Sequence, residues 1–285
     1  MKRISYLVNL VGTPATSIPR FTLDEIRFTR SMRLSLKLCA LLLLICYAVM
    51  ALASEALAVP RESQEEKEVN LKRQATGGLF QKWTFDQDQL QKAPTGFTAL
   101  ASGEGRPAEW TVQTYADAPS PSQIVAVSSL CEAEPCDQLL LATGFKYEYP
   151  DLAVSFRVQA GASGVGGVVL GVQDASNYYA AVVDLAGATA RVIRVVGGKE
   201  VVLAHSPVTL KQTEWHSIRV QRNTIISKDF IETFVDGVLV LSVEDQALGL
   251  GQVGLMARGK SALLFDAFHA VPLFSHRPLS SPPAY

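Results

Sequence analysis

Apolar and polar residues alternate with a period of two in many short runs between Leu79 and Pro272. In Leu152–Gln159, four apolar residues face one way, and the residues between them, Arg157 included, face the other. This alternation is typical of strands with one buried and one wetter face. Further runs, some of them continuously apolar, are bounded by turn residues and predict strands at Gly167–Gln173, Tyr178–Asp184, Ala190–Val196, Glu200–His205, Ile231–Val235, Val238–Leu241, Gln252–Ala257 and Ala262–His269.

Turn signals separate these runs. Gly197-Gly198 and Asp236-Gly237 stand between pairs of predicted strands and favour tight two-residue hairpins. Such signals recur roughly every 8–12 residues, and no segment here shows the pattern of an amphipathic helix. The sequence therefore predicts an all-β fold, an antiparallel β-sandwich of the jelly-roll type, over residues 79–273.

An apolar run precedes this region. Leu38–Ala53 follows two basic residues and ends in small residues suited to cleavage after Ala53 or Ala58, which indicates a signal peptide. Met32 would by itself begin a well-formed signal. The run is shorter than the roughly 20 apolar residues of a bilayer span, although an uncleaved N-terminal anchor is the alternative and would be the one link to a membrane. We expect a periplasmic or extracellular protein.

Composition divides the chain into four parts. Residues 1–58 form an extension with the signal, 59–78 a charged linker, 79–273 the sandwich, and 274–285 a Pro- and Ser-rich tail predicted to be disordered. The first 58 residues hold seven basic and three acidic side chains, which leaves 19 and 24, a formal net charge of −5. A mildly acidic mature chain argues against nucleic acid as a partner.

Two cysteines, Cys131 and Cys136, follow the signal. They flank a short polar stretch, and in an oxidising compartment a local disulfide is the natural outcome. The four histidines are scattered along the chain, so the sequence does not suggest a zinc site.

A series of motifs resembles a known superfamily. The motifs are, in order, Trp83–Asp86, Pro94–Phe97, Trp110–Val112, Gly166–Val169, Gln173–Tyr179, Trp215-His216, Val235–Gly237, Gly251–Leu255 and Phe265-Asp266. They are similar to those of the concanavalin A-like lectin/glucanase superfamily, and within it to bacterial exported laminin-G-like domains, including those grouped as 3-keto-disaccharide hydrolases. Relatives often carry a second Asp after Phe-Asp, where this chain has Ala267.

The resemblance implies a fold shared by lectins, adhesion modules and hydrolases. The Glu-x-Asp-x-Glu strand of the glucanases, which places catalytic carboxylates on one face, does not occur in this sequence. We therefore expect a non-catalytic recognition domain that binds carbohydrate or another cell-surface component on the concave face. The alternatives are a glycoside hydrolase of the 3-keto-disaccharide type and a structural or adhesion module.

The motif Gln173–Tyr179 supplies the candidate ligand-binding residues. Tyr178 or Tyr179 would stack on a sugar ring, while polar side chains bind hydroxyl groups. The polar candidates are Gln173, Asp174, Asn177 and Arg157. In the alternative reading, the Asp and Asn build a turn and one tyrosine packs in the core, and adjacent tyrosines on a strand face opposite sides.

Three acidic residues suggest a calcium site. Asp86 and Asp88 lie near the first strand and Asp266 near the last, and terminal strands of such sandwiches often pair. Grouped carboxylate oxygens are the ligands that Ca²⁺ prefers, and solvated acids are the alternative. We expect no other cofactor.

Overall fold

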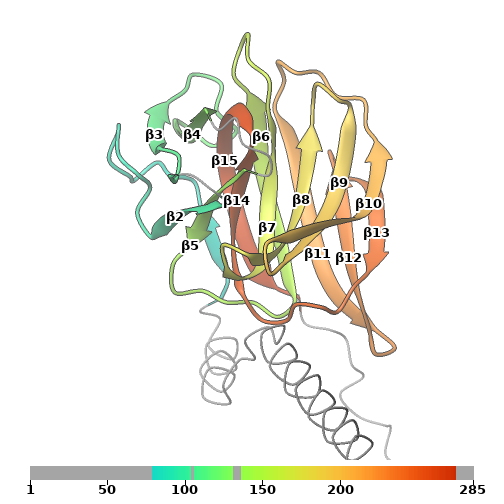
Figure 1. Cartoon of the computed structure of the whole chain (residues 1–285). Helices are drawn as coiled ribbons and strands as arrows, with labels where there is room; N and C mark the ends of the chain where they lie inside the picture. The colour runs from blue at the N-terminus through green and yellow to red at the C-terminus, as the bar shows by residue number, and fades with distance from the viewer. Residues whose placement is uncertain (1–78, 104–105, 131–135, 274–285) are drawn as a thin grey trace, which may run out of the picture. The chain divides into compact units, whose positions relative to one another are not determined.

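Two antiparallel β-sheets, facing each other, form the part of the chain that the computed structural model describes, residues 79–103, 106–130 and 136–273 (Figure 1). The predicted all-β sandwich is confirmed. A helix long and apolar enough to cross a membrane is not found in these residues. The predicted signal, linker and tail lie outside the described residues.

Sheet A contains eight strands. They are β1 (Gln81–Trp83), β3 (Trp110–Thr114), β4 (Gln123–Leu130), β6 (Pro150–Val158), β11 (His216–Ile225), β12 (Lys228–Val235), β13 (Val238–Glu244) and β15 (Lys260–Pro272). Their order is β13-β12-β11-β6-β15-β4-β3, and β1 pairs with β15. The first and last strands of the domain therefore pair, as the sequence predicts.

Sheet B contains seven strands. They are β2 (Phe97–Ser102), β5 (Asp137–Ala142), β7 (Val165–Asp174), β8 (Asn177–Asp184), β9 (Thr189–Val196), β10 (Lys199–Pro207) and β14 (Gln252–Arg258). Their order is β10-β9-β8-β7-β14-β5-β2. The last two strands of the described residues, β14 and β15, thus lie inside the two sheets, with partners on both sides.

The predicted hairpins form where the turn residues stand. Gly197-Gly198 joins β9 to β10, and Asp236-Gly237 joins β12 to β13. All four residues have positive φ, between 48° and 80°. Two consecutive left-handed residues match the right-handed twist of the flanking strands, which is why glycine and aspartate are favoured here.

Apolar side chains fill the space between the sheets and also cover the outer face of sheet B. The inter-sheet core contains the rings of Trp110, Phe156 and Phe265. A second buried cluster holds Leu139, Leu141, Val169, Val172, Tyr178, Ala180, Val182, Ile193, Val195 and Met256. Because neighbouring residues of a strand face opposite sides, sheet B buries both of its faces over this region.

Candidate binding site

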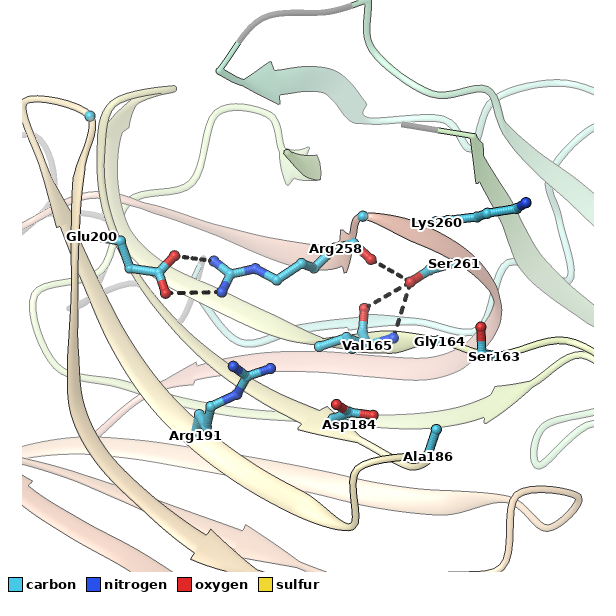
Figure 2. Close-up of a pocket in the computed structure, with 12 residues that line it drawn as sticks. Ser163, Gly164, Val165, Asp184, Ala186, Arg191, Glu200, Arg258, Lys260 and Ser261 are labelled. Atoms are coloured by element: carbon cyan, nitrogen blue, oxygen red, sulfur yellow. Dashed lines mark hydrogen bonds and ion pairs between the residues drawn. The ribbon is translucent and has the colours of Figure 1, made fainter. Parts of the chain in front are cut away.

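A pocket of about 770 Å³ lies at the border of the second apolar cluster, on the outer face of sheet B (Figure 2). Its walls come from the start of β7, the end of β8, β9, β10 and the turn from β14 to β15. The lining residues are Ser163, Gly164, Val165, Asp184, Ala186, Arg191, Gly198, Glu200, Arg258, Gly259, Lys260 and Ser261. Charged and hydroxyl side chains therefore dominate the pocket.

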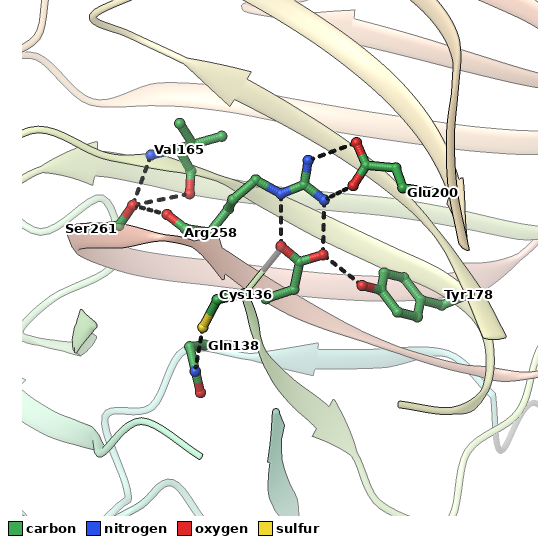
Figure 3. Close-up of polar contacts among 8 residues, drawn as sticks. Cys136, Gln138, Val165, Tyr178, Glu200, Arg258 and Ser261 are labelled. Carbon is green, nitrogen blue, oxygen red and sulfur yellow. Dashed lines mark hydrogen bonds and ion pairs between the residues drawn. The ribbon is translucent and has the colours of Figure 1, made fainter. Parts of the chain in front are cut away.

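Arg258 joins Glu200, a residue of the pocket lining, to Asp137, which is not among the lining residues (Figure 3). Its guanidinium donates to Asp137 on β5 through Nε and Nη2, at 2.7 and 2.8 Å. It also donates to Glu200 on β10 through Nη1 and Nη2, at 3.1 and 2.6 Å. The Tyr178 hydroxyl donates to Asp137 at 2.6 Å. Four side chains from four strands thus form one hydrogen-bonded network.

The bridge from Arg258 to Glu200 requires a bent sheet. Strands β7, β8 and β9 lie between β14 and β10. In a flat sheet, four strand spacings amount to about 19 Å, farther than an arginine and a glutamate side chain reach together. Since the two side chains meet at 2.6 Å, sheet B curves toward its outer face. This outer face is therefore concave.

Burial and hydrogen bonding fix the protonation states of this network. Burial raises the pKa of Tyr178 well above its ordinary value, and Asp137 raises it further, so the phenol stays protonated and acts as a donor. Burial opposes the charged form of Arg258, but its hydrogen bonds with Asp137 and Glu200 outweigh this, and its pKa is raised. The guanidinium is therefore a permanent cation, held rigidly at the pocket wall.

Three charged groups of the pocket keep unused hydrogen-bonding capacity. Asp184 lines the pocket, and its Oδ1 accepts a hydrogen bond from the backbone N–H of Gly187, while its Oδ2 accepts none within the described residues. Within the described part of the chain, the side chains of Arg191 and Lys260 form neither a hydrogen bond nor an ion pair. Arg191 Nε is buried and without an acceptor. These are the groups available to a ligand.

A second cavity of about 330 Å³ adjoins the pocket. It shares Ser163, Lys260 and Ser261 with the pocket, and Ser128, Ser129, Gly161, Ala162 and Ala262 complete its lining. The shared wall is held in place by the Ser261 hydroxyl, which donates to the Arg258 carbonyl and accepts from the Val165 N–H. The two cavities are therefore neighbours along one surface.

The two candidate stacking residues, Tyr178 and Tyr179, face opposite sides of sheet B, as expected, but both rings are 0% exposed. Tyr179 lies in the inter-sheet core, where its hydroxyl donates to Asp245 and accepts from the Leu248 N–H at 3.0 Å. Stacking on a sugar needs an open ring face, and neither tyrosine has one. The structure thus assigns Tyr178 to the support of the pocket through Asp137.

The polar candidates of the same motif build a turn. Asn177 Nδ2 donates to both Asp174 oxygens at 2.9 Å, and the Gly197 N–H donates to Asn177 Oδ1 at 2.9 Å. The turn-building alternative is therefore the one that the geometry supports. Gln173, at the end of β7, has a buried Oε1 without a partner, and it is not part of the pocket wall.

Arg157 belongs to the other sheet. It lies on β6 of sheet A, where it forms an ion pair with Asp117 at 2.8 Å and stands over the ring of Tyr115. Because Arg157 and the Gln173–Tyr179 motif lie on different sheets, the structure does not bring the predicted ligand-binding residues together. Arg157 instead contacts Asp117 and Tyr115 locally, on sheet A.

The three acids of the predicted calcium site are engaged with the backbone. Asp266 is fully buried and accepts from the Ser120 N–H and hydroxyl, each at 2.7 Å, and burial raises its pKa. Asp86 and Asp88 accept backbone N–H groups at 3.1 Å. No group of three acidic, histidine or cysteine side chains that could hold a metal occurs in the described ranges. The calcium site stays a prediction.

The predicted disulfide falls partly outside the described residues, because Cys131 is not among them. Cys136 is buried, and Gln138 Nε2 lies 3.4 Å from its Sγ. The pairing of the two cysteines therefore stays a prediction.

Sequence reasoning did not single out Asp184, Glu200, Arg258 and Lys260 as pocket residues, although the alternation pattern carries a signal for some of them. Asp184 follows buried Val182 by two positions, Arg258 follows Met256, and Arg191 precedes Ile193. The two-residue period places each on the outer face of sheet B. What the sequence does not reveal is that β8 and β10 curve toward β14, because curvature depends on contacts between distant strands.

The fold is similar to known structures, whereas no family model and no curated protein matches the sequence. A carbohydrate-binding module, CBM66 from Bacillus subtilis, superposes with a TM-score of 0.50 and 17% identity, covering 62% of this chain and 95% of the module. The cellulose induced protein Cip1 gives 0.48 and 12%, covering 68% and 97%. Galectin LEC-6 from Caenorhabditis elegans gives 0.35 and 12%, covering 50% and 95%. The described domain thus shares a jelly-roll β-sandwich fold with this carbohydrate-binding module, and the concanavalin A-like superfamily with its laminin-G-like and 3-keto-disaccharide groups stays a prediction.

Proposed function

We propose that this chain is an exported, non-catalytic carbohydrate-binding domain, and that its ligand enters the pocket of sheet B. The observation that carries the proposal is the pocket itself. It lies on the concave face, its volume is within the roughly 300–1,000 Å³ typical of ligand sites, and hydrogen-bonding side chains line it. The similarity of the fold to a carbohydrate-binding module supports the same reading.

The pocket suits a ligand rich in hydroxyl groups. Hydrogen bonds to charged groups are stronger than neutral ones, and Asp184 offers an acceptor while Arg191 and Lys260 offer donors. Arg258 is held from two sides, so it loses little conformational freedom when a ligand binds. Recognition would rest on polar contacts with the hydroxyls, since no aromatic ring is among the lining residues that the structure describes.

A glycoside hydrolase is the second candidate, because two carboxylates, Asp184 and Glu200, line the same pocket. Hydrolysis needs one carboxyl group that is protonated and donates to the leaving oxygen. Both oxygens of Glu200 already accept hydrogen bonds from Arg258. This arrangement suits an acceptor of hydrogen bonds better than a general acid.

A steric block tests the location of the site. Ala186 is exposed in the turn after β8 and lines the pocket, so Ala186→Trp should fill it. Ala247 is exposed and outside both cavities, which makes Ala247→Trp a matched control. The full chain and both variants are titrated calorimetrically with neutral and acidic oligosaccharides, and the products are separated by chromatography.

Binding that is lost in Ala186→Trp and kept in Ala247→Trp, with no cleavage, is the expected result. Binding unaffected by Ala186→Trp would place the site elsewhere and refute this pocket. Cleavage of any ligand would replace the binding function by the hydrolase, and absence of binding throughout the panel would leave the structural or adhesion role.

A further inference from the structure

The cationic side chains of the pocket fall into two groups: one is paired with carboxylates of the protein, and the others have no partner among the described residues. Arg258 meets two carboxylates, so its charge is compensated inside the protein. Arg191 and Lys260 line the same pocket with no anion within ion-pair distance in the described residues. The uncompensated groups include two cations, and the ligand is the natural source of a counter-charge.

Arg191 has particular reason to need an acceptor. Its Nε is shielded from solvent and carries an N–H without a hydrogen bond. A buried donor without a partner is destabilising, and an acceptor on a bound ligand would remove this cost. Its neighbours across the sheet, Val182 and His205, do not provide a carboxylate. The guanidinium extends into the pocket, between Asp184 and the bridge from Arg258 to Glu200 (Figure 2).

Lys260 occupies the junction between the two cavities. It lines both, and among the described residues around the second cavity it is the one charged side chain. The remaining walls of that cavity are serine, glycine and alanine, which offer hydroxyl contacts and room. A ligand that fills both cavities would therefore run past the Lys260 ammonium group, which lies between the two cavities.

We propose that the ligand is an acidic oligosaccharide of two or more sugar units, bearing carboxylate or sulfate groups. One unit occupies the larger pocket with its anionic group at Arg191, and the next occupies the second cavity, with Lys260 between them. This inference rests on the proposed carbohydrate-binding function and adds to it the charge and the minimum length of the ligand.

Paired ligands test the charge. Oligogalacturonates are compared with their carboxyl-reduced, neutral counterparts, and sulfated oligosaccharides form a separate arm that distinguishes the two anionic groups. For the acidic trimer, Arg191→Met and Lys260→Met should each weaken binding about 10-fold or more, as expected for a lost charge-assisted hydrogen bond. The control Lys211→Met removes an exposed lysine outside both cavities and should change the affinity less than about 2-fold.

The length of the ligand is tested separately. Ser128 is exposed and lines only the second cavity, so Ser128→Trp should lower the affinity for the trimer to that for the monosaccharide. An equal affinity for monosaccharide and trimer in the unaltered chain would refute the second subsite. Neutral oligosaccharides that bind as tightly as acidic ones, with loss in Ala186→Trp, would refute the anionic ligand and keep the proposed function. Absence of binding to either class would refute both.

Discussion

Asp137 is the residue whose replacement tests the pocket's supporting network most directly. Its carboxylate is 1% exposed and accepts three hydrogen bonds, two from Arg258 and one from Tyr178. Asp137→Asn removes the charge and replaces one acceptor by a donor. Arg258, itself 9% exposed, then keeps only Glu200 as a counter-charge. Breaking a buried ion pair from one side costs about 3–5 kcal/mol, a large part of a typical total of about 5–15 kcal/mol.

Urea unfolding of the full chain, followed by tryptophan fluorescence, measures this loss. With a slope of about 1–3 kcal/mol/M, the midpoint should fall by about 1 M or more. The matched control is Asp117→Asn, whose carboxylate is 66% exposed and pairs with Arg157 on the other sheet. An exposed pair contributes about 0–1 kcal/mol, so this control should unfold close to the unaltered chain.

Replacing both buried partners separates charge from packing. Asp137→Leu combined with Arg258→Met and Tyr178→Phe removes both buried charges and the hydroxyl that Asp137 binds, and it leaves only Glu200, which is 24% exposed, without its partner. This variant should be more stable than Asp137→Asn alone, because apolar substitutes for a buried ion pair are often tolerated. The reasoning fails if Asp137→Asn unfolds within about 1 kcal/mol of Asp117→Asn.

Three further substitutions test other parts of the fold. Asp266→Asn should cost about 1–3 kcal/mol, because the amide turns a donor toward the Ser120 N–H; an unchanged thermal midpoint would contradict this. Gly254→Ala should cost about 3 kcal/mol or more, since a Cβ there would lie 2.1 Å from the Leu140 carbonyl oxygen; native-like unfolding in urea would show that the strands can separate. Burial lowers the pKa of His269 in the folded chain below its ordinary value of 6.5. As the pH falls through 6.5, the unfolded chain therefore binds a proton before the folded chain does, and the free energy of unfolding decreases. His269→Gln should therefore flatten the stability profile between about pH 7.5 and pH 5, and profiles of equal slope would argue against this role.

The sequence predicts the local features of this domain and misses the long-range ones. The turns at Gly197-Gly198 and Asp236-Gly237 are encoded by residues that adopt positive φ, so the hairpins follow from the sequence alone. Tyr178 and Tyr179 occupy opposite faces because neighbouring side chains of a strand point to opposite sides. Alternation does not reveal that the outer face is buried as well, because that depends on the curvature by which Arg258 reaches Glu200 across three strands.

The positions of β14 and β15 have a consequence for how the chain becomes folded. β15 separates β6 from β4, and β14 separates β7 from β5, so without them each sheet is divided into two parts that do not touch through hydrogen bonds. A growing polypeptide cannot complete either sheet until its last strands have left the ribosome. Such pairings between distant segments slow folding, because loops must close before they gain contacts. In the growing chain, both sheets therefore stay divided until β14 and β15 have been made.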